Sequence, residues 1–179
     1  MRHAVALAWV GLLFADGSQG KPRLTEPQVA LDGQRVEISF ALVDGFDDEL
    51  LERIRTGLPS GYVFDLRLLR DRKRWFDVQI DSSRMEVVAS YDAVTREYLV
   101  NTKQDGRLIE SKVVRDEREL ERALTRFTAM PVFTLEGGGD PRRLILRMRA
   151  EIDSANLLFF IPRRVATPWR DSRKFRPPQ

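Results

Sequence analysis

Three arginines near the C-terminus have the spacing of side chains on one face of a β-strand. Arg143, Arg147 and Arg149 alternate with the apolar residues Leu144, Leu146, Met148, Ala150 and Ile152. Because every second residue of a strand points to the same side, their guanidinium groups would line up ~6.8 Å apart or twice that. Such a row can clamp a phosphate, a carboxylate or an acidic partner surface. It can also pair with acidic side chains of neighbouring strands, Glu37 or Asp65 among them, which is the interpretation that the pattern favours.

Other candidate binding residues lie in turns and in the tail. Arg74 and Trp75 belong to a basic run at the tip of a predicted hairpin, and Arg96 lies in a predicted turn. From residue 163 on, the cations are Arg163, Arg164, Arg170, Arg173, Lys174 and Arg176, against Asp171 alone. A cation close to anionic lipid contributes up to about 1 kcal/mol. The prolines of the tail prevent a clear amphipathic helix, so the tail predicts either lipid contact or a solubilising extension, and its order stays open.

Several familiar catalytic and metal-binding side chains are missing. The chain has no cysteine and a single histidine, His3, so thiolate ligands, thiol nucleophiles and a histidine-dependent triad have no residues to use in a chain that loses its first residues. Among the carboxylates, Asp77 and Asp81 would lie about 13–14 Å apart along one strand, beyond the ~5–9.5 Å of a glycosidase pair. We therefore predict no enzyme activity, no cofactor and no metal site.

The N-terminus has the layout of a secretory signal peptide. Arg2 and His3 form a short positive region, residues 4–14 are apolar and uncharged, and small residues follow. The apolar run is too short for a membrane-spanning helix, which needs roughly 20 residues, and a lipoprotein would need a cysteine. The sequence thus predicts a signal peptide over residues 1–20, a single β-rich domain over 21–162, a basic tail over 163–179, and a soluble periplasmic protein. Export argues against nucleic acid as the partner.

Hydrophobic periodicity predicts strands and two short helices. Residues 35–43, 61–70, 76–81 and 143–152 alternate with period two, as half-buried strands do, and so do the central strands around 87–91, 98–102 and 109–113. Asp47 and Asp116 are placed to cap helices over 48–56 and 117–127, the second with an apolar stripe of Leu120, Ala123, Leu124 and Phe127. Strands at hairpin spacing with one apolar face predict a mainly β, antiparallel β-sandwich, immunoglobulin-like or similar, with both helices in connections. A single curved sheet with both helices on one face is the alternative.

Two turns predict the pairing of the central strands. A four-residue loop over 93–96 places Tyr91 directly opposite Tyr98, as a cross-strand aromatic pair. Asp105-Gly106 is typical of a tight hairpin turn. Its expected register pairs Thr102 with Ile109, Val100 with Ser111 and Tyr98 with Val113, which would give three strands one mainly apolar face.

These elements together resemble a bacterial family known as domain of unknown function 4390. The resemblance rests on an exported start, "RWFD", "YDAVTREY", a helix and a final arginine-bearing strand, most specifically on Trp75-Phe76-Asp77 and on Tyr91, Thr95, Arg96 and Tyr98. It implies an uncharacterised exported envelope protein, often encoded near a sensor histidine kinase, and an aromatic-rich C-terminus to which only Trp169 and Phe175 correspond. The family brings no catalytic residues.

The function that the sequence predicts is an exported, non-enzymatic binding or accessory protein of the bacterial envelope. Its partner would be an envelope or membrane protein, which the family resemblance links to a membrane sensor system. The basic tail is a candidate for contact with anionic lipid. Two alternatives stay open. A carboxylate-dependent hydrolase of an envelope polymer would need a pocket with converging carboxylates, and a lipid carrier would need an open apolar cavity between the sheets.

Overall fold

The computed structural model describes residues 20–72, 76–135, 143–155 and 162–176. Eleven strands lie within these ranges: β1 (Arg23–Leu24), β2 (Gln28–Asp32), β3 (Arg35–Val43), β4 (Ser60–Arg70), β5 (Val78–Asp92), β6 (Glu97–Gln104), β7 (Arg107–Val114), β8 (Arg126–Thr134), β9 (Leu144–Ala155), β10 (Pro162–Ala166) and β11 (Arg170–Asp171). Two helices, α1 (Asp48–Arg55) and α2 (Glu117–Thr125), lie in the connections. No helix in the described ranges is long and apolar enough to cross a membrane.

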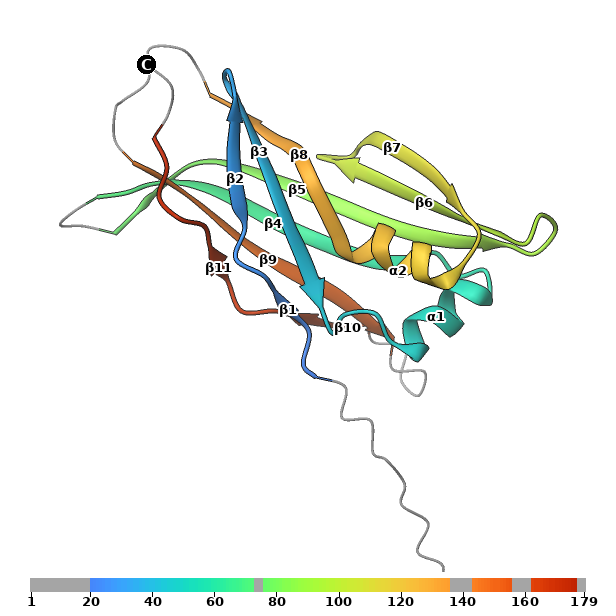
Figure 1. Ribbon diagram of the computed structural model, residues 1–179. Helices are drawn as coiled ribbons and strands as arrows, with labels where there is room; N and C mark the ends of the chain where they lie inside the picture. The colour runs from blue at the N-terminus through green and yellow to red at the C-terminus, as the bar shows by residue number, and fades with distance from the viewer. Residues whose placement is uncertain (1–19, 73–75, 136–142, 156–161, 177–179) are drawn as a thin grey trace, which may run out of the picture.

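The strands form two antiparallel sheets that face each other. In the small sheet β3 pairs with β8 on one side and with β1 and β2 on the other. In the large sheet the order is β10-β9-β4-β5-β6-β7, and β11 also pairs with β9. The small sheet crosses over the large one, α1 and α2 lie together at one end, and the β4–β5 connection lies at the other (Figure 1). The antiparallel sandwich with two helices in connections is confirmed, in preference to a single curved sheet.

Alternation along β4 and β9 explains how the two sheets pack. On β4, Tyr62, Phe64, Leu66 and Leu68 are buried; on β9, Leu144, Leu146, Met148 and Ala150 are buried. The predicted inward face of the last long strand is therefore confirmed. Phe64 of β4, Phe40 of β3 and Phe127 of β8 form an aromatic cluster with ring centroids 4.7–5.2 Å apart. Because Phe40 and Phe127 belong to the small sheet, this cluster joins the two layers.

Both helices begin where their predicted caps lie. The side chain of Asp47 accepts a hydrogen bond from the backbone N–H of Leu50 at 2.8 Å, and Asp116 accepts one from Glu119 at 2.8 Å. Each cap satisfies a backbone donor that the first helical turn leaves without an internal partner. Gly57, with φ of +84°, follows α1 and accepts the left-handed conformation that ends a helix.

One register and one helix boundary were predicted wrongly. Tyr91 lies opposite Tyr98 as expected, with ring centroids 4.9 Å apart. The next hairpin, however, pairs Thr102 with Glu110, Val100 with Lys112 and Tyr98 with Val114, because a bulge between Thr102 and Lys103 shifts β7 by one residue. Since side chains alternate with period two, the shift turns Ile109 and Val113 outward instead of toward the core.

The second correction concerns residues after α2. The helix ends at Thr125, and Phe127, predicted as part of its apolar stripe, instead begins the buried face of β8. The alternation of β8 is broken by Ala129 in the left-handed region, with φ of +50°, and by irregular pairing around Pro131. Because these breaks remove the period-two pattern, the sequence did not predict this strand.

The basic tail, whose order the sequence left open, extends the large sheet. Ala166 pairs with Glu151 through β10, Arg170 pairs with Met148 through β11, and Phe175 forms a bridge with Leu144. The proposed signal peptide, apart from Gly20, and the apolar segment 156–161 lie outside the described residues.

We predict that the buried hydroxyl of Tyr62 makes stability fall at high pH. Tyr62 is 1 % exposed and donates a hydrogen bond to the backbone carbonyl of Gly45 at 2.6 Å. Burial, followed by the charge of Asp47, raises its pKa above the ordinary value. Above about pH 10 the unfolded chain releases this proton while the folded chain keeps it, so the free energy of unfolding decreases as the pH rises.

The Tyr62→Phe variant tests this. It should lose about 0.5–1.5 kcal/mol near neutral pH, because the Gly45 carbonyl loses its donor. The difference in the free energy of unfolding between the variant and wild type should then narrow above about pH 10. Only wild type has the Tyr62 hydroxyl, whose ionisation in the unfolded chain lowers its stability there. Urea unfolding followed by circular dichroism across that range measures both; a difference that stays constant would contradict the prediction.

Candidate functional site

The predicted arginine row lies on the outer face of the large sheet, but its members have different surroundings. Arg149 lies opposite Asp65 in the pairing of β9 with β4. Its Nε and Nη2 donate to Asp65 Oδ2 at 3.0 and 2.9 Å, and Nη2 also donates to Glu151 Oε1 at 2.9 Å. Arg84 of β5 approaches from the other side, with Nη1 3.2 Å from Asp65 Oδ1. Arg149 therefore pairs internally, with the acidic residue that the sequence had singled out.

Arg147 is also engaged within the sheet. Its Nε and Nη2 donate to the two carboxylate oxygens of Asp171 at 2.6 and 2.8 Å. These bonds to Asp171 raise the pKa of the Arg147 guanidinium. Such two-pronged pairing fixes the geometry of both side chains. In this structure Arg147 attaches β11 to β9.

An indole ring from the tail covers this part of the sheet. The guanidinium carbon of Arg67 lies 4.5 Å from the centroid of Trp169, and that of Arg149 lies 4.7 Å from it. A cation near the face of an indole is attracted by the negative ring surface. Trp169 thus covers two cations of the outer face and adds to the attachment of the tail. Sequence reasoning missed this role, because the contact joins residues 20 or more positions apart.

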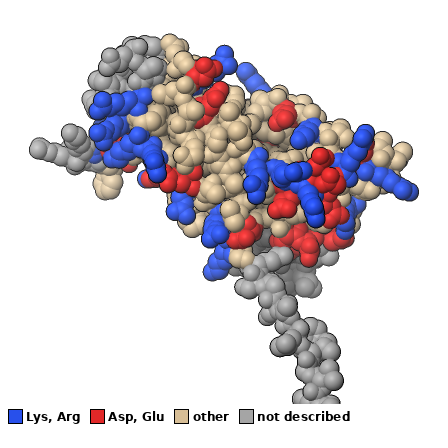
Figure 2. Space-filling model, viewed as in Figure 1, with Lys and Arg blue, Asp and Glu red and all other residues tan. Residues whose placement is uncertain are grey.

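A separate group of cations is exposed at the end of the molecule where the tail around Phe175 and the start of β9 meet the β4–β5 connection. The backbone N–H of Asp71 donates to the carbonyl of Arg143 at 2.9 Å, and Phe175 exchanges backbone hydrogen bonds with Leu144. These contacts bring together the first turn of the hairpin, the start of β9 and the tail. We call the exposed residues Arg72, Phe76, Arg143 and Arg176 of this region the basic end; Arg170 lies further along the sheet, opposite Met148 of β9. Figure 2 shows Lys and Arg gathered here, whereas both signs mix around the helices.

The acids at this end already have cationic partners. Asp71 pairs with Lys174 at 2.8 Å, Asp171 pairs with Arg147, and Glu26 pairs with Arg173 at 3.4 Å. No ion pair joins Arg72, Arg143, Arg170 or Arg176 to a carboxylate in the described part of the chain. Among the described residues, the charges of these arginines are not neutralised by an ion pair.

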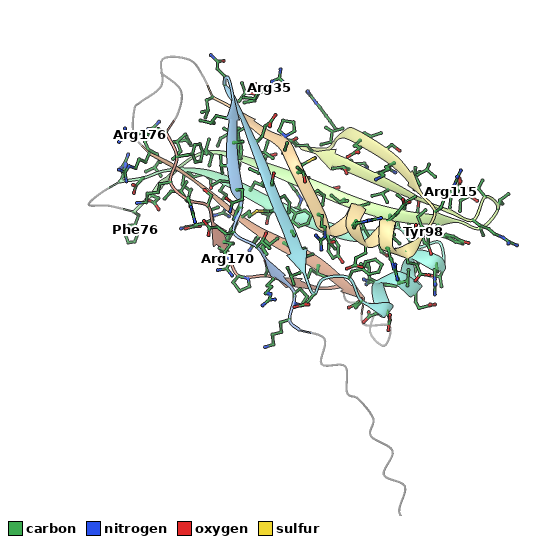
Figure 3. The ribbon with its side chains drawn as sticks, in the orientation of Figure 1. Arg35, Phe76, Tyr98, Arg115, Arg170 and Arg176 are labelled. Carbon is green, nitrogen blue, oxygen red and sulfur yellow. The ribbon has the colours of Figure 1, made fainter. Side chains whose placement is uncertain are left out.

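Phe76 gives the basic end an apolar component. Its side chain is 95 % exposed, more than any other large hydrophobic residue in the described ranges. Phe76 and Arg176 lie at the same end of the molecule, whereas Tyr98 and Arg115 lie at the opposite end (Figure 3). Among the described residues, nothing covers most of this phenyl ring. Phe76 is therefore the apolar candidate for a contact at this end.

The remaining sequence-predicted candidates are not brought into this region. Arg96 lies in the exposed β5–β6 turn with φ of +57°. The 15-residue strand β5 separates that turn from Phe76, a length of about 45–50 Å at the rise of a strand. Arg74 and Trp75 lie outside the described residues.

The described carboxylates do not form an open acid–base pair. Asp65 and Asp105 line a shallow depression of about 280 Å³ on the outer face. Arg84 occupies the space between them, because its side chain donates to Asp65 while its backbone N–H donates to Asp105 at 2.8 Å. In the described ranges no three His, Cys, Asp or Glu side chains lie close enough to hold a metal ion.

A family model described as domain of unknown function (DUF4390) matches residues 20–163. The chain belongs to this family. No curated protein and no solved structure matches it. The DUF4390 match includes Arg72, Phe76 and Arg143 of the basic end, whereas Trp169, Arg170 and Arg176 follow the matched region.

We predict that Asp65 contributes to stability through its two arginines. Its side chain is 19 % exposed. Asp65→Ala would remove one of the two carboxylates that Arg84 and Arg149 share, leaving them Glu151. We expect the free energy of unfolding to fall by about 1–3 kcal/mol. The control, Glu97→Ala, breaks a pair with Arg115, whose side chain is 83 % exposed, and should cost no more than about 1 kcal/mol. If chemical denaturation gave both variants the same loss in the free energy of unfolding, the prediction that the Asp65 pairs stabilise more than an exposed ion pair would be wrong.

Proposed function

We propose that this protein is an exported, non-enzymatic accessory protein of the bacterial envelope, which uses its basic end to contact an anionic membrane surface. The contact would hold the domain beside a membrane-protein partner, such as a component of a sensor system. The observation that carries the proposal is the convergence of three exposed features, the hairpin at Arg72 and Phe76, the start of β9 at Arg143, and the tail at Arg176. Each comes from a different part of the chain.

The combination of charges with one exposed phenyl group favours lipid over an acidic protein. Cations near an anionic leaflet contribute about 1 kcal/mol each, and the attraction is screened by salt. A phenyl group enters the boundary between headgroups and acyl chains, which adds apolar burial that salt does not screen. Since Arg147 and Arg149 are engaged with Asp171 and Asp65, the structure supports a docking role for Arg143 in the predicted arginine row, and structural roles for the other two.

The test is co-sedimentation of the protein purified from the periplasm with phosphatidylcholine vesicles, with and without phosphatidylglycerol. We expect binding only to the anionic vesicles and weaker binding at high salt. Arg143→Glu combined with Arg176→Glu should weaken binding by more than about tenfold, since two attractions of about 1 kcal/mol become repulsions. Phe76→Ser should weaken binding and leave its salt dependence unchanged.

The matched control is Arg118→Glu, an exposed cation on α2 at the opposite end of the molecule. It lowers the net charge by 2, as much as Arg143→Glu or Arg176→Glu alone, so it is compared with each of these single variants, and it should leave vesicle binding nearly unchanged. An equal loss in this control would mean that net charge alone drives binding. Absence of binding to anionic vesicles would overturn the lipid proposal, even if crosslinking in envelope extract found a protein partner that the double variant loses.

A further inference from the structure

β7 ends the strand order of the large sheet, and its outer edge is unpaired in the described structure. The strand has eight residues without proline or glycine. No backbone hydrogen bond joins this edge to another described segment. Among other edge strands, β8 contains Pro131 and irregular pairing, β10 begins with Pro162, and β11 has two residues.

Apolar side chains are also exposed at this edge. Nine large hydrophobic residues are exposed in the described ranges, and four of them belong to β6 and β7: Leu99 (38 %), Leu108 (58 %), Ile109 (45 %) and Val113 (54 %). Leu99 lies directly opposite Val113 in the β6–β7 pairing. An unpaired strand edge beside exposed apolar side chains is a template for adding another strand.

The residue order of β7 is complementary to itself in one antiparallel register. If Ser111 lies opposite Ser111 of a second copy, Glu110 of each copy faces Lys112 of the other, and Ile109 faces Val113. Opposite charges and apolar side chains directly across a ladder stabilise it, whereas like charges destabilise it. The two symmetric registers nearest to this one fail, because they place Glu110 opposite Glu110 or Lys112 opposite Lys112.

Symmetry limits the choice to such registers. A two-fold axis perpendicular to the sheet leaves the outer faces of both copies on the same side. Two residues can then lie directly opposite each other only if both side chains point to the inner face or both point to the outer face. The bulge at Ile109 ends the regular part of β7, which confines the ladder to Ile109–Val113. In a dimer with this ladder, one apolar surface would form on the outer face from Leu99, Ile109 and Val113 of both copies.

We propose that the protein forms a two-fold dimer by antiparallel pairing of β7 with β7 of a second copy, with Ser111 on the axis. The ladder is short and the contact lies at the small end of specific interfaces. The dimer therefore dissociates on dilution. This contact is at a different part of the molecule from the basic end and does not depend on the membrane proposal.

Charge exchange tests the register. In sedimentation velocity, Glu110→Lys or Lys112→Glu alone should weaken the dimer by about tenfold or more, because two attractive pairs become repulsive. The double variant Glu110→Lys/Lys112→Glu should recover it. Mixing the two single variants should form a heterodimer, because each then supplies the charges that the other lacks. Failure of both recovery and heterodimer formation would overturn the register.

A cysteine scan provides a second test, since the natural chain has no cysteine. Directly opposite residues of an antiparallel pair have Cα atoms about 4.5–5.5 Å apart, which permits a disulfide. Ser111→Cys should therefore crosslink two copies under mild oxidation. Val113→Cys is the matched control on the same face; its two copies would lie four residues apart, or about 14 Å, and should not crosslink. Equal crosslinking, or wild type that stays monomeric at every concentration, would overturn the proposal.

Discussion

The alternation of side chains along β4 governs both faces of the large sheet. Strand β4 lies between β9 and β5 and makes long regular ladders with each. On the inner face Phe64 joins the aromatic cluster that holds the small sheet. On the outer face the next residue, Asp65, accepts hydrogen bonds from Arg84 and Arg149. Because the period is two, a shift of one residue in β4 would bury Asp65 and expose Phe64, so core and outer charges specify the same register.

The same outer face explains why the arginine row divides into structural and exposed members. Where β9 lies beside a strand that offers a carboxylate, the guanidinium is used within the fold, as Arg149 is with Asp65 and Arg147 with Asp171. Arg143 precedes β9 and lies where the acids that flank it, such as Asp71, already pair with Lys174. Whether an arginine of this row is exposed thus depends on whether a neighbouring strand places an unpaired carboxylate beside it. A stripe of like residues in a sequence does not show which member has a partner.

Local patterns predicted much of this fold. Asp47 and Asp116 were recognisable as caps because their backbone partners lie three residues away, and the Tyr91–Tyr98 pair because a short loop determines it. Long-range pairings were harder: nothing near Trp169 in the chain indicates that its ring meets Arg67 and Arg149. Arg143 could be named as a candidate from spacing, but the exposure of Phe76 could not, because an alternating pattern does not show which apolar side chains the fold leaves uncovered.

The wrong register of β7 carries physical information of its own. With the expected pairing, Ile109 and Val113 would have faced inward, and the strand would have needed no cover on its outer side. The bulge between Thr102 and Lys103 instead turns them to solvent and places Glu110 and Lys112 along a groove beside α2 and β8. Full burial of such a side chain stabilises by roughly 1.5–3 kcal/mol, and Ile109 and Val113, 45 % and 54 % exposed, forgo about half of that. In the proposed dimer a second copy would recover part of this energy and would replace water as the hydrogen-bond partner of the edge backbone groups. The apolar area that the bulge exposes is therefore the driving force that the proposed association would use.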